Sequence, residues 1–146
     1  MKVQLKRLND NYLMEAQNSD GNRVLLDANP SIGGSGAGIR PMEGVLMSLA
    51  GCSSIDVISI MKKQKQFPTN FNVQVEAERL DAVPALFTKI FLEFQMEGEI
   101  DAIKAKRAIE LSMTKYCSVT KMLEPGVQIY SSLRLNGELE SVTSPA

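Results

Sequence analysis

Hydrophobic and polar residues alternate in the first 27 positions of the chain. Val3 and Leu5 stand between polar neighbours, and the same period of two continues from Tyr12 to Ala16. This period places side chains alternately on the two faces of a β-strand. The segments 9–11 and 19–22 are rich in Asn, Asp and Gly, which is typical of turns. The region is therefore predicted to form a three-stranded meander.

Residues 41–66 show a different pattern, in which apolar side chains no longer keep to one face. Pro41 suits the first turn of a helix, and the lysines near residue 63 suit the negative end of the helix dipole. Phe67-Pro68 then ends the helix, because a residue before proline is disfavoured in the α conformation. The sequence predicts one long helix over 41–66.

The apolar residues of this helix point around most of its circumference, as they do in a helix that is buried on nearly all sides. They are Val45, Leu46, Met47, Leu49, Ile55, Val57, Ile58, Ile60 and Met61. A chain of 146 residues can hardly enclose such a helix alone, so we expect a second subunit to cover part of it. Serines and Asp56 interrupt the apolar run, so the helix is not predicted to span a membrane.

The remaining residues again alternate as strands around a second helix. Alternating runs over 71–77 and 86–96, with a turn between them, predict a long antiparallel pair. Asp101 can cap a helix whose apolar residues recur at helical spacing as far as Cys117.

After this helix, one further helical turn is predicted over 119–123. A last strand follows over 127–135 and ends at Asn136-Gly137, and the polar tail from Ser141 is expected to be loose. Consecutive strands thus pair as hairpins rather than alternating with helices, which indicates an α+β fold in a single domain over residues 1–146.

Residues 29–40, between the meander and the long helix, are rich in glycine and serine. They lack the Gly-Lys-Ser/Thr end of a phosphate-binding loop, so a nucleotide site is not predicted there. We expect a mobile loop that leads into the helix.

The charge is nearly balanced at −1, which gives no electrostatic basis for binding nucleic acid or an anionic membrane. The first residues contain no apolar stretch of a signal peptide. With two cysteines and no targeting segment, we expect a protein of the reducing cytoplasm.

The chain contains no histidine. This excludes Ser-His and Cys-His nucleophiles and all imidazole metal ligands. Two cysteines far apart in the sequence also fall short of a zinc site, so we predict neither a metal nor a cofactor.

Cys52 and Asp56 are the candidates for chemistry in the long helix, because their spacing of four places them on one face. Each also has a simpler interpretation: a buried cysteine often only fills space, and a carboxylate among apolar residues can be hydrogen-bonded or capping. An ionised Asp56 would disfavour a neighbouring thiolate, so Asp56 is not the activator. A guanidinium could activate the thiol, with Arg40 as first choice and Arg7 as the alternative, although each can equally be a solvated surface residue.

Together these residues resemble the OsmC/Ohr family, and the lysine-rich end of the helix is closest to its YhfA-like branch. Two motifs about 65 residues apart carry the resemblance, with the expected strands and helices between them. They are Pro41-Met42-Glu43, Leu46-Met47, Leu49-Ala50-Gly51-Cys52, Asp56-Val57 and Ser59-Ile60 in the helix, and Tyr116-Cys117-Ser118-Val119-Thr120 after it.

The resemblance implies an intertwined homodimer with two active sites at the interface and a thiol peroxidase activity on organic hydroperoxides. Cys52 would match the peroxidatic thiol and Cys117 the resolving thiol, with sulfurs within about 5 Å of each other. A dithiol reductant would return the resulting disulfide to two thiols.

Two positions depart from the family pattern. Peroxidase members carry a glutamate ten residues before the first cysteine, where this chain has Met42. Glu43 points roughly opposite to Cys52 and cannot simply replace it. Ser118 replaces the usual proline after the second cysteine and is expected to free the backbone there.

Two functional hypotheses follow. The first is an OsmC-like, thiol-dependent hydroperoxide reductase. The second is a non-catalytic or differently catalytic dimer of the same fold that binds an apolar ligand at the subunit interface.

Overall fold

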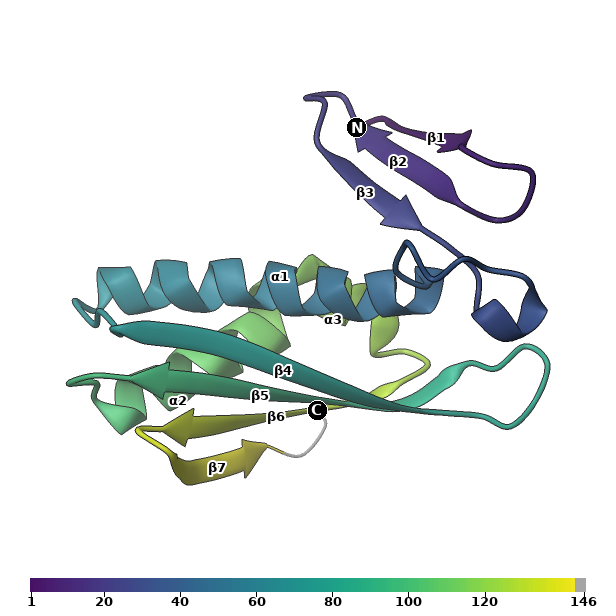
Figure 1. Cartoon of the computed structure of the whole chain (residues 1–146). Helices are drawn as coiled ribbons and strands as arrows, with labels where there is room; N and C mark the ends of the chain where they lie inside the picture. The colour runs from purple at the N-terminus through teal and green to yellow at the C-terminus, as the bar shows by residue number, and fades with distance from the viewer. Residues whose placement is uncertain (144–146) are drawn as a thin grey trace. The chain divides into compact units, whose positions relative to one another are not determined.

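The structure is a computed structural model that describes residues 1–143 of the chain. The chain divides into two units, Met1–Leu46 and Met47–Ala146, and the division falls inside helix α1 (Pro41–Lys63) (Figure 1). A single domain over residues 1–146 stays a prediction.

The first unit contains the predicted meander, in which β2 pairs antiparallel with both of its neighbours. Its elements are β1 (Val3–Arg7), β2 (Met14–Asn18), β3 (Arg23–Leu26) and the short 3₁₀ helix η1 (Pro30–Ile32). The Arg7 side chain donates hydrogen bonds to the carbonyls of Asp10 and Asn11, the latter at 3.0 Å. Arg7 thus closes the turn that follows its own strand.

The glycine-rich loop after β3 is organised around Asp27, which is only 2% exposed. One Asp27 oxygen accepts from the Ala28 N–H at 2.8 Å, and the other accepts from the Ser35 N–H at 2.9 Å and from its hydroxyl at 2.6 Å. The Ser35 hydroxyl is the main cause that lowers the pKa of the Asp27 carboxyl, against the opposing effect of burial. A Cβ on Gly34 would lie 1.9 Å from the Ala28 carbonyl oxygen, so only glycine fits. Asp27 thus joins the two ends of the segment 27–35 through hydrogen bonds, and the mobility expected of this loop stays a prediction.

Helix α1 begins where the sequence predicted. Pro41 is its first residue, and the Glu43 carboxylate accepts the backbone N–H of Arg40 at 2.8 Å. This is one half of a capping box, in which the third helical residue reaches back to the cap.

The same helix ends at Lys63, three residues earlier than predicted. Lys65 adopts a left-handed conformation with φ 56°, and the Gln66 N–H donates to the Met61 carbonyl at 2.9 Å. These are the marks of a Schellman motif, which satisfies the last carbonyls of a helix. The turn ends the helix before Phe67-Pro68 can do so.

Only one stripe of α1 is buried within a single chain. It consists of Leu49, Ser53, Val57 and Met61, spaced four residues apart. Apolar residues on the other faces stay accessible, with Met47 53% and Ile55 68% exposed. The predicted burial on nearly all sides is therefore not achieved by one chain.

By length and composition alone, the 23 residues of α1 would also suffice to cross a membrane. The core helix of a soluble protein passes the same test, so this is weak evidence for a span. Asp56 at the middle of the helix would be costly in hydrocarbon.

The second unit contains a four-stranded sheet in the order β4-β5-β6-β7. Its strands are β4 (Asn70–Arg79), β5 (Phe87–Glu97), β6 (Gln128–Leu135) and β7 (Glu138–Thr143). The predicted β4–β5 hairpin is confirmed, and β5 pairs parallel with β6. A parallel neighbour requires a crossover, and the segment from Gly98 to Val127 supplies it.

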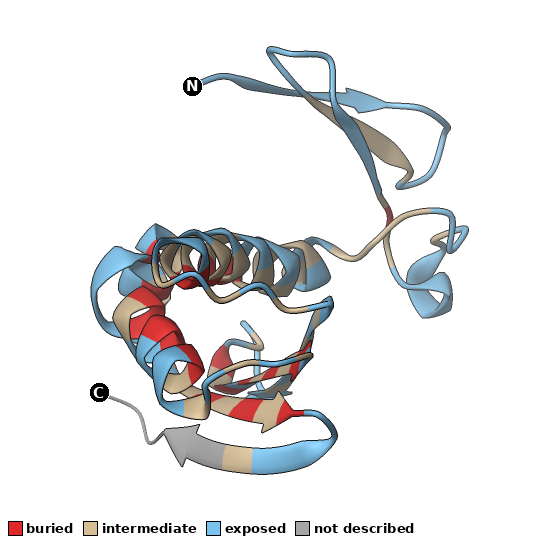
Figure 2. Ribbon diagram, turned by 90° about the vertical axis from the view of Figure 1, so that its left-hand side faces the viewer, coloured by how far each residue is buried: buried red, intermediate tan, exposed pale blue. Residues whose placement is uncertain are grey.

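The crossover carries three helical elements, which are α2 (Ala102–Leu111), the π-helical turn η2 (Ser112–Tyr116) and α3 (Ser118–Leu123). Asp101 caps α2 as predicted and accepts from the Ile103 and Lys104 N–H groups at 2.9 and 3.2 Å. Helices α1 and α2 cover one face of the sheet, and the buried residues lie where these layers meet (Figure 2). In β5 the covered face consists of Ile90, Leu92, Phe94 and Met96.

Strand β7 is an element that the sequence analysis missed. Asn136 and Gly137 both have positive φ, at 50° and 88°, as a two-residue hairpin of type I′ requires. The chain therefore turns back along β6 instead of ending its last strand there. The predicted loose tail is wrong as far as Thr143, and residues 144–146 lie outside the described part of the chain.

Candidate functional site

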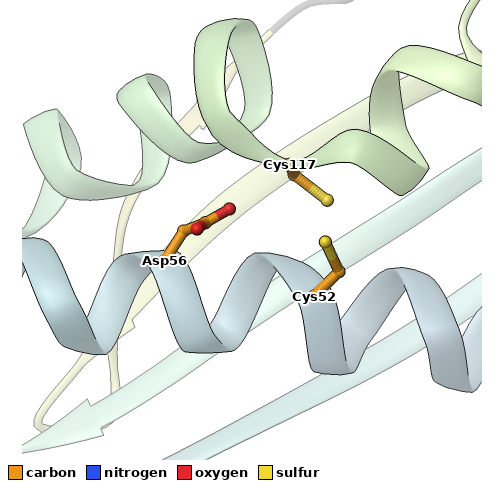
Figure 3. Close-up of side chains that lie close together, drawn as sticks. All are labelled: Cys52, Asp56 and Cys117. Atoms are coloured by element: carbon orange, nitrogen blue, oxygen red, sulfur yellow. The ribbon is translucent and has the colours of Figure 1, made fainter. Parts of the chain in front are cut away.

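Cys52, Asp56 and Cys117 form one cluster in the second unit, and their sulfur and carboxylate oxygen atoms all lie within 4.8 Å of one another. Figure 3 shows the two thiols pointing toward each other, with the Asp56 carboxylate beside them. Both cysteines are free thiols. The predicted approach of the two sulfurs is confirmed, and so is the common face of Cys52 and Asp56.

Helix α1 positions two of the three side chains. Cys52 and Asp56 are both half-buried, one turn apart, and lie next to the buried stripe that contains Ser53 and Val57. The contact of that stripe with the core therefore fixes the direction in which the Cys52 sulfur points.

Cys117 is held by an irregularity of the crossover. Its N–H donates to the Ser112 carbonyl at 2.8 Å, five residues back, which closes the π-helical turn η2. The chain is then extended at Cys117, and the Cys117 sulfur accepts the Thr120 N–H at 3.4 Å as the N-cap of α3. Widened turns of this kind are frequent at functional sites.

The Cys117 side chain is completely buried, at 0% exposure. Burial raises the pKa of the Cys117 thiol above its ordinary value, because the thiolate loses its hydration. The hydrogen bond from Thr120 acts in the opposite direction, and the neighbouring Cys52 adds to the rise. At neutral pH Cys117 is therefore a protonated thiol.

The Ser112 hydroxyl links the two helical segments of the site. It lies 3.4 Å from Asp56 Oδ2 and 3.2 Å from the Ser53 carbonyl oxygen. Asp56 was expected to be a hydrogen-bonded carboxylate, and Ser112 on the opposite helical segment provides one such hydrogen bond. Ser112 is fully buried, whereas Asp56 is only half-buried, so the serine supports the carboxylate from the protein side.

Two residues of the site were not foreseen. Ser112 looked like an ordinary residue of the second helix, and Thr120 became part of the site only through its backbone N–H. A sequence signal for the Thr120 contact was available in the order Cys117-Ser118-Val119-Thr120. Cys117 stands directly before a short helix, where a side chain can accept a backbone N–H as an N-cap. Ser118 occupies the first position of α3, where proline would fit equally well, so its replacement of the family's proline leaves the turn intact.

The other predicted site residues stabilise backbone in the first unit. The Arg40 guanidinium donates to the Gly38 carbonyl at 3.0 Å, Glu43 caps α1, and Arg7 closes its turn. A role of Arg40 or Arg7 in activating Cys52 stays a prediction, and so does a supporting role of Glu43.

A cavity of about 380 Å³ opens beside Asp56, between α1 and the end of α2. Its lining residues are Asp56, Ser59, Ile60, Lys63, Gln64, Leu111 and Tyr116. The cluster therefore has an approach from solvent on the side of its carboxylate. Chemically, two facing thiols can be oxidised to a disulfide, and sulfur and carboxylate oxygen are also donor types that bind Zn²⁺.

Known proteins resemble this chain in sequence. Residues 34–132 match the family model described as OsmC-like protein. Protein YhfA of Escherichia coli (strain K12) is 41% identical over 117 residues, which are 80% of this chain and 84% of YhfA.

Solved structures agree with this match. A hypothetical protein from Aquifex aeolicus VF5 superposes with a TM-score of 0.77 at 25% identity, over 92% of this chain and 96% of that one. A protein of Legionella pneumophila named as an organic hydroperoxide resistance protein OsmC superposes with a TM-score of 0.68 over 91% and 96% of the two chains. Its identity is 14%, so this likeness shows the fold alone. The family model and the YhfA match together show that this chain belongs to the OsmC-like protein family.

Proposed function

We propose that the protein is a thiol-dependent hydroperoxide reductase in which Cys52 is the peroxidatic thiol and Cys117 the resolving thiol. The observation that carries the proposal is the pair of free sulfurs within 4.8 Å, one half-buried and one fully buried. Membership of the OsmC-like family supports it, as does the fold shared with a protein named for organic hydroperoxide resistance.

The reaction needs two steps at sulfur. The Cys52 thiolate attacks one oxygen of the hydroperoxide, the O–O bond breaks, and the departing alkoxide takes a proton to become an alcohol. The resulting Cys52 sulfenic acid is then attacked by Cys117, which forms the S–S bond and releases water. A dithiol reductant gives two electrons and two protons to regenerate both thiols.

The burial of the two thiols suits these different roles. A peroxidatic sulfur must be reached by substrate, and Cys52 is the less buried of the two. A resolving sulfur needs only to reach its partner, and the raised pKa of Cys117 keeps it from competing for peroxide as a thiolate. Arg40, or alternatively Arg7, is proposed as the cation that favours the Cys52 thiolate. Asp56 beside Cys52 and Glu43 beside Arg40 are proposed to orient these groups without activating the thiol.

The proposal includes a homodimer in the reducing cytoplasm. The exposed apolar faces of α1 support a second copy as the covering partner, and a reducing compartment would supply the dithiol reductant. No nucleic acid or membrane takes part in the proposed reaction.

The direct test is to give the reduced protein one equivalent of an organic hydroperoxide and to identify its products. We expect one alcohol per chain and an intramolecular Cys52–Cys117 disulfide by mass spectrometry. Cys52→Ser should consume no peroxide, and Cys117→Ser should stop at the sulfenic acid. Oxidised wild type without the 52–117 disulfide would contradict a two-cysteine mechanism.

A second test uses Met42, which stands where the family's peroxidases have a glutamate. A carboxylate there should hold the activating guanidinium and favour the Cys52 thiolate, because a flexible arginine loses entropy on being fixed. Met42→Glu is therefore expected to raise the rate of peroxide consumption in stopped-flow measurements, with Met42→Gln as the uncharged control. If wild type, Met42→Glu and Cys52→Ser are equally inert, the reductase proposal is wrong.

A second candidate function is a dimer that binds an apolar ligand without peroxide chemistry. A cavity of about 200 Å³ at the end of α1 favours it, because most of its lining is apolar. The lining residues are Ile58, Met61, Lys62, Gln66, Phe67, Pro68 and Phe71. Ligand binding that persists in Cys52→Ser would favour this alternative.

A further inference from the structure

The Cys52–Asp56–Cys117 cluster brings together three donors of the kinds that bind a thiophilic metal ion. Zinc binds sulfur at about 2.3 Å and carboxylate oxygen at about 2.0–2.2 Å, so donors around one ion lie roughly 3.5–4 Å apart. The three donor atoms here lie within 4.8 Å of one another. Movements of the side-chain donor atoms by about 1 Å would bring them to coordinating distances.

The charges in the cluster also favour a cation. Three groups that can each be negative face one another, and no Lys or Arg forms an ion pair with Asp56 among the residues that the structure describes. Placing two thiolates and a carboxylate within 4.8 Å of one another has a cost in Coulomb repulsion. A divalent ion between them would remove that cost, because it attracts each group more strongly than the groups repel one another.

The surroundings hold the donors in place as the outer ligands of a metal site do. The Ser112 hydroxyl lies 3.4 Å from an Asp56 oxygen, and the Thr120 N–H donates to the Cys117 sulfur at 3.4 Å. Such contacts orient ligands and commonly raise metal affinity. The cavity beside Asp56 gives an ion a route from solvent to the carboxylate side of the cluster. A water molecule is the usual fourth ligand of an open zinc site.

We propose that the reduced protein binds a divalent thiophilic ion such as Zn²⁺ through Cys52, Asp56 and Cys117, and that the bound ion prevents oxidation of the two sulfurs. On binding, each thiol releases one proton, so the two thiolates, the carboxylate and the divalent ion together carry a net charge of −1. The sulfur electron pairs that would attack a peroxide or form the disulfide are then donated to the metal. Three protein ligands suffice for an open tetrahedral site, so the lack of histidine does not exclude it.

This inference uses the same sulfurs as the proposed function but does not depend on peroxide chemistry. Its test is titration of the reduced full-length protein with Co²⁺ under anaerobic conditions. We expect a thiolate-to-cobalt charge-transfer band that saturates at one ion per chain, and displacement of the cobalt by Zn²⁺. Calorimetry in buffers of different ionisation enthalpy should report release of about two protons per ion at neutral pH.

Variants assign the ligands. Cys52→Ser and Cys117→Ser should each lose the charge-transfer band of a two-thiolate site. Asp56→Asn should weaken binding by at least about 10-fold, since even the loss of an outer partner costs about 10–100-fold. Asp81→Asn removes an exposed carboxylate in the β4–β5 turn and should bind as wild type does. Far-UV circular dichroism checks that each variant is folded, and Asp56→Asn keeps both thiols if a cysteine variant fails to fold.

The protective effect gives a second readout. Zn²⁺ should slow the reaction of both thiols with a disulfide reagent by at least about 10-fold, because bound thiolates are poor nucleophiles, and a chelator should restore the rate. Saturable binding that survives Cys52→Ser and Cys117→Ser, or no binding by wild type, would overturn the inference. Metal binding without peroxidase activity would contradict only the proposed function, and peroxidase activity without metal binding would contradict only this inference.

Discussion

At the scale of single residues, the Cys117 sulfur combines three roles. It fills a fully buried position, caps helix α3 and faces Cys52. The cap and the burial oppose each other, since the Thr120 N–H favours a negative sulfur and the loss of water disfavours it. Burial has the larger effect, so the folded state favours the neutral thiol.

This balance predicts a stability that falls at alkaline pH. Because the pKa of Cys117 is raised in the folded state, the unfolded chain loses this proton first, and its ionisation above about pH 8.5 favours unfolding. The contribution is complete below the unfolded pKa and is lost as pH rises through the folded one. Urea unfolding of the reduced protein between about pH 7.5 and 9.5 should show a steeper decline for wild type than for Cys117→Ser. Identical slopes would contradict this interpretation.

Residue types and spacing predicted part of the site. The pairing of Cys52 with Asp56 follows from a separation of four in a helix, whereas the meeting of Cys52 and Cys117 was inferred from the family resemblance. The role of Ser112 could not be predicted, because it depends on a π-helical turn that has no clear sequence signature. Thr120 could be recognised only from the Cys117 cap of a short helix, since it gives the sulfur a backbone N–H. The buried position of Asp27 could not be predicted either, because its partners are mostly backbone N–H groups that approach it only in the folded loop.

At the scale of the elements, the sequence pattern located the strands and longer helices of the described chain, apart from β7, and missed the short 3₁₀ helix η1. The end of α1 and the existence of β7 were mispredicted, and both errors concern residues with positive φ. Asn136-Gly137 is a strong hairpin signal that was interpreted as the end of a strand. Lys65 gives no such signal, because lysine is an unusual residue at a left-handed helix end.

The conformation of Lys65 can be tested by substitution. Lys65→Gly should stabilise the protein by about 0.5–1 kcal/mol, because the cost of left-handed lysine is removed and the extra entropy of glycine offsets part of the gain. Lys62→Gly is the matched control inside the last turn of α1, and it should destabilise by about 1 kcal/mol. Urea unfolding of both variants measures the difference. Equal losses of stability in the two variants would mean that Lys65 does not adopt the left-handed conformation in solution.

At the scale of the whole molecule, the α+β class and the membership of the OsmC-like family are confirmed, while the parallel pairing of β5 and β6 was not foreseen. Strand alternation reports which face is covered but not which neighbour a strand selects. The apolar faces of α1 remain exposed in one chain, and a second copy of the chain is the partner that we proposed for them.

The dimer prediction follows from these faces. Sedimentation at micromolar concentration should show a dimer. Its buried interface is expected to be well above about 2,000 Å² in total, as in obligate homodimers. Ile55→Glu places a charge on the exposed side of α1 and should weaken the dimer or unfold it. Ile103→Glu is the matched control, because Ile103 is 79% exposed on α2 and should not affect assembly. A stable, folded wild-type monomer would contradict the prediction.

The parallel pairing of β5 and β6 also determines when the thiol pair can form during synthesis. The β4–β5 hairpin joins neighbouring segments, but Lys89 pairs with Gln128, far along the chain. The segment that carries Cys117 is anchored at both ends only once β6 has joined the sheet. Since a chain grows by about 5–20 residues per second, Cys52 emerges seconds before its partner sulfur is in place. Each newly made chain therefore passes through an interval in which Cys52 has no second thiol beside it. An oxidant that reacts with Cys52 during this interval cannot lead to the Cys52–Cys117 disulfide.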